Sequence, residues 1–237
     1  VAIHESGHAV IGLKLEDANE VHKITIIPRG VAGGYTMMLP KEEKIAILTK
    51  NEILAQIVGL LGGRVSEELY FGEITTGASD DFKRATRLAR SMVTEYGMSD
   101  LGPMQLEHQS ENVFLGRDYG KTKNFSDQVA LEIDKEVRKI IDECYKQATD
   151  ILKKNKELVM LLTDALMKYE TLTKEQIDYI VENKDINFKK LDEDDNNDNK
   201  NETLDDLKTK AKAAGIKGYS KMNKDELKEK LENSEEE

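Results

Sequence analysis

The sequence predicts a mostly α-helical protein with a small β-hairpin near its amino terminus. Apolar residues recur every three or four positions along several long segments, which is the spacing of one face of a helix. The 237 residues include no Trp and only 3 Pro, and 38% are hydrophobic. That composition is more typical of helix-rich proteins than of sandwiches or barrels.

The first seventy residues are predicted to form a helix, a hairpin and a second helix. The first helix covers Val1–Leu15. Val21–Pro28 (VHKITIIP) and Gly34–Leu39 (GYTMML) read as strands, and the turn residues between them predict a hairpin. The apolar spacing from Lys41 to Tyr70 predicts the next helix, with an interruption allowed near Lys50.

The middle of the chain is predicted to contain two loops around one helix. The segment Gly72–Ser79 lacks a helical pattern, and Ser79 or Asp80 is placed to cap a helix that ends near Tyr96. A second loop follows over Gly97–Lys123.

The remaining helices of the first domain begin after Ser126, a predicted cap. The apolar stripe of the first one reaches Leu152, and two shorter helices end near Val181. The single cysteine, Cys144, belongs to this stripe, so we expect a buried thiol, no disulfide within the chain and a reduced cytoplasmic setting.

A run of acids and asparagines, DEDDNNDNKNE, divides the chain. Such a run has nothing to bury and predicts a disordered linker. We therefore expect a domain over 1–190, a linker over 191–202 and a helical hairpin over 203–233. The net charge of −11 disfavours nucleic acid as the partner of the whole surface, because phosphates would be repelled.

The sequence shows no membrane-spanning pattern. No apolar run approaches the roughly 20 residues that a span needs, so we expect these residues to be soluble by themselves. The chain opens without Met, inside an apolar-periodic helix that no capping residue precedes. We therefore expect it to be a piece of a longer protein.

The first helix carries the motif His4-Glu5-Ser6-Gly7-His8. Residues four apart lie on one helical face, so His4 and His8 can both bind one Zn²⁺ ion. Glu5 follows at an angle that lets it reach a water molecule on the metal, as a general base does. The motif predicts a zinc-dependent peptidase.

A catalytic zinc site needs a third protein ligand, and the residues alone leave its identity open. No G-x-x-H follows His8, which excludes the metzincin pattern. The candidates are the acids near two helix ends and two distant histidines: Glu67, Glu68, Asp80, Asp81, His22 and His108.

Several segments resemble the FtsH family of membrane-anchored, ATP-dependent zinc metalloproteases. They are AIHESGHAVIG, KITIIPRG, GGYTMMLP, LGGRVSEELYFG and TTGASDDFKRATRLARSMVTEYGMSDLGP, in the family's order. The resemblance covers Val1 to about Val181. It implies one Zn²⁺ per subunit held by His4, His8 and Asp81, with Glu5 as the base.

Other residues of these segments are expected to have supporting roles. Glu67 and Asp80 are expected to support the ligands, with Glu67 the rival to Asp81 as third ligand. The second strand of the hairpin begins with glycines and could add an extended substrate as a further strand. Its candidate substrate-binding residues are Gly34, Tyr35, Thr36 and Met37.

For the intact protein, the resemblance implies a homohexamer on the cytoplasmic face of the cell membrane. Its substrates would be unfolded polypeptides, misassembled membrane proteins and short-lived cytosolic proteins, as in protein quality control. The chain holds no G-x-x-x-x-G-K-[ST] phosphate loop. ATP and Mg²⁺ would therefore act only through an ATPase domain, and the membrane anchor through amino-terminal segments, that these residues lack.

The predicted hairpin 203–233 resembles the helical modules of the Rho termination factor amino terminus and of SAP domains. It could bind nucleic acid through Lys217, Lys221 and Lys224, or act as a protein-binding spacer. Two other functions stay open for the whole chain. It could be a non-catalytic scaffold or adaptor, or a zinc peptidase that needs no ATPase.

Overall fold

The computed structural model describes residues 1–30, 33–41, 47–107 and 125–188, and single positions at 208, 211, 212, 222, 223 and 227. The chain divides into two compact units, Val1–Ile186 and Asn187–Glu237. The predicted linker 191–202 and almost all of the predicted hairpin 203–233 lie outside the described residues. Both stay predictions.

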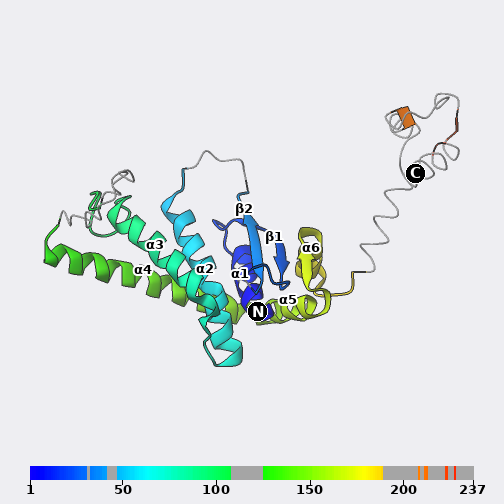
Figure 1. Cartoon of the computed structure of the whole chain (residues 1–237), viewed down its shortest axis with the longest axis horizontal. Coiled ribbons are helices and arrows are strands. Elements are labelled where there is room, and N and C mark those ends of the chain that lie inside the picture. Colours follow the sequence, from blue (N-terminus) through cyan, green and yellow to red (C-terminus); the bar gives the residue numbers. More distant parts are fainter. Residues whose placement is uncertain are drawn as a thin grey trace. The chain divides into compact units, whose positions relative to one another are not determined.

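The first unit is mostly helical and contains one small sheet, as the sequence predicts (Figure 1). Its elements in chain order are α1 (Ala2–Lys14), β1 (Glu20–Thr25), β2 (Tyr35–Leu39), α2 (Lys50–Phe71), the 3-10 helix η1 (Thr76–Ala78), α3 (Ser79–Thr94), α4 (Asp127–Lys154), α5 (Lys156–Tyr169), β3 (Thr171–Thr173) and α6 (Lys174–Asn183).

The sheet has three antiparallel strands in the order β2-β1-β3. The predicted hairpin is present, with Ile24 opposite Thr36. The third strand was not predicted, because three residues are too few to show alternation. It joins the sheet by pairing Leu172 with Ile24, and both side chains are fully buried.

Helix α2 begins later than its apolar pattern suggests. Residues 47–49 are not helical, and residues 42–46 lie outside the described part of the chain. Thr49 and Glu52 form a capping box, in which each side chain accepts a hydrogen bond from the other's backbone N–H. Two N–H groups that have no partner within the helix are hydrogen-bonded there. The helix therefore starts near the predicted interruption at Lys50.

Of the two predicted caps of later helices, one is confirmed and one is wrong. Ser126 caps α4 as predicted, accepting a hydrogen bond from the N–H of Val129. The prediction that Ser79 or Asp80 caps α3 is wrong, since Ala78 occupies the cap position without a side-chain bond. The reason is that η1 runs directly into α3, so the chain is already turning when it reaches these two residues.

Helix α1 lies between α2 and the hairpin, and it also packs against α5 (Figure 1). The contact with α2 is close at Gly7, where an added Cβ would lie 2.4 Å from the carbonyl oxygen of Gly62. Only glycine allows that approach. No helix among the described residues is long and apolar enough to cross a membrane.

Candidate metal centre

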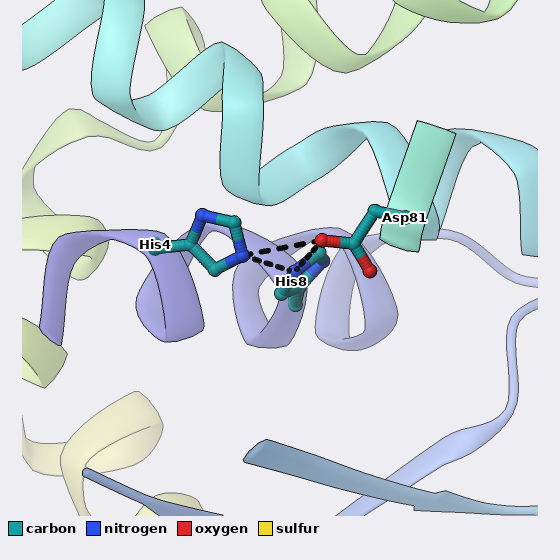
Figure 2. Close-up of side chains that lie close together, drawn as sticks. All are labelled: His4, His8 and Asp81. Carbon is teal, nitrogen blue, oxygen red and sulfur yellow. Dashed lines mark hydrogen bonds and ion pairs between the residues drawn. The ribbon is translucent and has the colours of Figure 1, made fainter. Parts of the chain in front are cut away.

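His4 and His8 present their Nε2 atoms to one point beside α1 (Figure 2). These two atoms are 3.1 Å apart. Each imidazole is mostly buried, with 12% of the side chain exposed. The predicted sharing of one helical face by residues four apart is therefore present in the structure.

Asp81 completes this cluster from the first turn of α3. Its Oδ2 atom lies 3.3 Å from Nε2 of His4 and 3.5 Å from Nε2 of His8 (Figure 2). Among the described residues, His4, His8 and Asp81 form the one group of three whose donor atoms converge closely enough to hold a metal ion.

The outer nitrogens of the two imidazoles have partners that can only accept a hydrogen bond. Nδ1 of His4 lies 2.9 Å from Oε1 of Glu67, and Nδ1 of His8 lies 2.7 Å from the carbonyl oxygen of Gly59. Both Nδ1 atoms must therefore carry hydrogen. In the neutral rings, the Nε2 lone pairs then face each other and the carboxylate.

The charges in the cluster perturb one another. Burial on its own lowers the pKa of His8, but the hydrogen bond and charge of Asp81 and the charge of Glu5 outweigh it and raise the pKa above 6.5. Burial likewise opposes ionisation of Asp81, yet hydrogen bonds and charge from His4 and His8 hold its pKa well below the usual range. The site favours a positive charge at its centre.

The neighbouring helix α2 makes room for the two rings at Gly63. A Cβ there would lie 2.5 Å from Cε1 of His4 and 2.6 Å from the Nε2 atoms of both histidines. Gly63 was not predicted from the sequence to be part of the site. Its signal was the presence of Gly59, Gly62 and Gly63 inside one helical pattern, since glycine in a helix usually has a packing reason.

Glu5 is buried, with 6% of its surface exposed, and contacts the hairpin. Its Oε2 accepts a hydrogen bond of 2.8 Å from the hydroxyl of Thr36, on β2. The same hydroxyl lies 3.2 Å from the backbone oxygen of Glu5. The predicted base and the predicted substrate-binding strand are thus in direct contact, which the sequence could not show.

The other predicted supporting residues differ in their surroundings. Glu67 is buried behind His4, and both of its carboxylate oxygens also accept from Thr75. Asp80 is exposed at the start of α3 and is absent from the converging group. Gly34 directly precedes β2, Tyr35 is its first residue and Met37 lies at its middle.

The remaining candidates for a third ligand lie elsewhere. Glu68 is exposed and accepts a hydrogen bond from Tyr145. His22 contacts Glu20 on β1, at 3.1 Å. His108 lies outside the described residues.

Comparison with known proteins places the chain in a family. The sequence model of Peptidase family M41 matches residues 1–180. Over 180 residues the chain is 62% identical to the ATP-dependent zinc metalloprotease FtsH of Acholeplasma laidlawii, a match over 76% of this chain and 28% of the relative. It is 52% identical over 200 residues to the protein of that name from Bacillus subtilis, covering 84% of this chain and 31% of the relative.

A third relative is the ATP-dependent zinc metalloprotease FtsH of Mycoplasma mobile, 51% identical over 185 residues, or 77% of this chain and 26% of the relative. The matched region thus spans between 26% and 31% of these three relatives. Because the family model covers three quarters of the chain, from α1 into α6, this chain belongs to peptidase family M41.

Proposed function

We propose that this chain is a zinc-dependent endopeptidase in which His4, His8 and Asp81 hold the metal and Glu5 is the general base. The observation that carries the proposal is the convergence of three donor atoms at 3.1, 3.3 and 3.5 Å from one another. The relatives are named as zinc metalloproteases, which supports the choice of metal.

The cluster fits Zn²⁺ in both chemistry and size. Two imidazoles and one carboxylate are a donor set typical of catalytic zinc, which leaves a fourth position open. Ligands about 2.0–2.1 Å from a tetrahedral zinc ion are about 3.3 Å from one another, close to the three separations observed here. In the neutral rings, lone-pair donors at such distances repel one another unless a metal ion or a proton lies between them.

When bound, Zn²⁺ acts as a Lewis acid that polarises a peptide carbonyl and acidifies a water molecule. Glu5 takes a proton from the attacking water at its carboxylate and gives it to the nitrogen of the leaving amine. Thr36 restricts the rotation of that carboxylate by donating to Oε2. Glu67 and Gly59 hold the imidazoles in the tautomer that turns Nε2 inward.

We further propose that substrate adds to β2 as an extended strand. Among the described residues β2 pairs only with β1, so its outer edge has backbone groups available for another strand. Thr36 contacts the base, and Met37, the next residue along the strand, is 42% exposed. Recognition through backbone groups would allow substrates of many sequences, including unfolded polypeptides.

The relatives are named as ATP-dependent, and this chain matches less than a third of their length. We propose that ATP hydrolysis belongs to a part of the protein outside these 237 residues. By resemblance to the FtsH family, the intact protein would be a membrane-anchored homohexamer that delivers unfolded chains to the site.

The test compares the parent chain with Glu5→Gln, which keeps the shape of the side chain and removes its basicity. Both should bind one zinc ion per chain by metal analysis. Hydrolysis of unfolded casein should fall by about 10²–10⁴-fold in the variant, the usual contribution of a general base. Equal hydrolysis would refute the role of Glu5, and a parent without zinc or activity would favour a scaffold.

A further inference from the structure

Thr75 lies in the loop between α2 and η1 and uses all of its polar groups. Its hydroxyl donates to Glu67, at 3.1 Å from Oε2 and 3.2 Å from Oε1, and accepts from the N–H of Gly77 at 3.1 Å. Its own N–H points at Oε2 of Glu67, 3.3 Å away. Its carbonyl accepts from Arg64 at 3.0 Å.

Glu67 is the link between this threonine and the candidate metal site. It is buried, and its Oε1 accepts from Nδ1 of His4 at 2.9 Å. A carboxylate with one partner can rotate, whereas the hydroxyl and N–H of Thr75 add two donors that restrict its rotation. His4 and Thr75 are therefore joined through one carboxylate.

The same threonine also contacts the segment that leads to Asp81. It caps η1, and η1 continues directly into α3, in whose first turn Asp81 lies. Arg64 holds this stretch at both ends, since it donates to the carbonyl of Thr75 and lies 5.5 Å from the ring centroid of Phe82. Two side chains of α2, one helical turn apart, thus hold the segment 75–82.

These contacts connect two candidate ligands that are far apart in the sequence. His4 reaches Glu67 from α1, and Asp81 follows Thr75 by six positions at the start of α3. We propose that Thr75 is a positioning residue for the metal site, whose hydroxyl holds Glu67 against His4 and fixes the turn that places Asp81. This inference rests on the proposed zinc site.

Three variants separate the effect of the Thr75 hydroxyl from that of its backbone. Thr75→Val removes the hydroxyl while keeping the branched shape, and the backbone of Thr75, at φ −109 and ψ 167, is extended and suits valine. Thr75→Ser keeps the hydroxyl. Thr76→Val is the matched control, because the neighbouring Thr76 is also exposed and lies one step outside the chain of contacts.

The readout is the affinity of the zinc-free protein for Zn²⁺ alone, measured by competition with a chromogenic chelator. Loss of a group that hydrogen-bonds a ligand typically lowers metal affinity about 10–100-fold. Thr75 acts one step further out, through Glu67, so for Thr75→Val we expect the lower end of that range, about 10-fold. Thr75→Ser and Thr76→Val should stay within about threefold of the parent, a difference below 1 kcal/mol. Thermal unfolding of the zinc-free forms measures any general loss of stability.

Unchanged zinc affinity in Thr75→Val would overturn the inference. This holds even if the variant unfolds at a lower temperature, because Thr75 would then serve only the stability of the fold. Equal losses in the serine and valine variants would overturn the role of the hydroxyl. Thr75→Ala gives the same readout should the valine variant not fold. A parent that binds no zinc would instead overturn the proposed function itself, so the two failures are distinct.

Discussion

Replacing Gly63 by alanine should disrupt the metal site, whereas the same change at Gly59, one turn earlier on α2, should not. Each substitution removes a glycine from a helix interior, which by itself stabilises a protein by about 0.5–1 kcal/mol. An added Cβ at Gly59 meets no atom within 4 Å, and alanine keeps the carbonyl that accepts from His8. Gly59→Ala is therefore the matched control.

The Cβ of Gly63→Ala would lie 2.5–2.6 Å from three ring atoms of His4 and His8. This is about 1 Å inside the optimal contact distance of about 3.5 Å, so both rings must shift. Such crowding costs about 1–3 kcal/mol, enough to cancel the gain in helix propensity. Because two donor atoms are displaced, we expect zinc affinity to fall by about 100-fold or more, the upper end of the range for indirect supports.

Zinc affinity is measured by chelator competition, and thermal unfolding is recorded with and without zinc. Zinc-free Gly59→Ala should melt about 1–4 °C above the parent, since about 1 kcal/mol shifts Tm by about 2–4 °C at this size. Its zinc affinity should match the parent. Zinc affinity of Gly63→Ala within about threefold of the parent, or an equal loss of affinity in both alanine variants, would refute this role of Gly63.

Two predictions concern parts of the fold away from the metal. Ser126→Ala removes the hydrogen bond to the N–H of Val129 and should destabilise the protein by about 1 kcal/mol, seen as a lower Tm with unchanged zinc affinity; an unchanged Tm would contradict this. Burial, aided by the charge of Glu143, raises the pKa of Cys144 from 9.0 to about 12. At pH 9 about half of the unfolded thiols are ionised but only about one in a thousand native ones, so iodoacetamide should label Cys144 only after unfolding; rapid labelling of the native protein would show that the thiol is accessible.

The helices could be predicted because their signals are local. The apolar spacing of α4 and the cap at Ser126 involve residues three or four apart, which interact within one turn. The prediction was less accurate where the signal depended on distant partners. Strand β3 exists because Leu172 pairs with Ile24, and α3 starts without a cap at Ser79 because η1 leads into it.

Within the site, too, the local arrangement could be predicted and the long-range contact could not. The spacing of the histidine pair in one helix was enough to predict that His4 and His8 converge, and the structure has their Nε2 atoms 3.1 Å apart. The third partner was different, since the residues alone left several candidates open and the family resemblance favoured Asp81. Its position beside the pair follows from the packing of α2 on both α1 and α3.

The sequence by itself therefore determined the fold class, the main helices and the motif on α1, because each depends on contacts within a few residues. Only the tertiary structure decided which side chains surround that motif. Glu67 reaches His4 across 63 positions, Thr36 reaches Glu5 across 31, and Gly63 leaves the space that both imidazoles occupy. These contacts arise when α1 is buried between α2 and the hairpin, and no local pattern encodes which residues of those elements will face it.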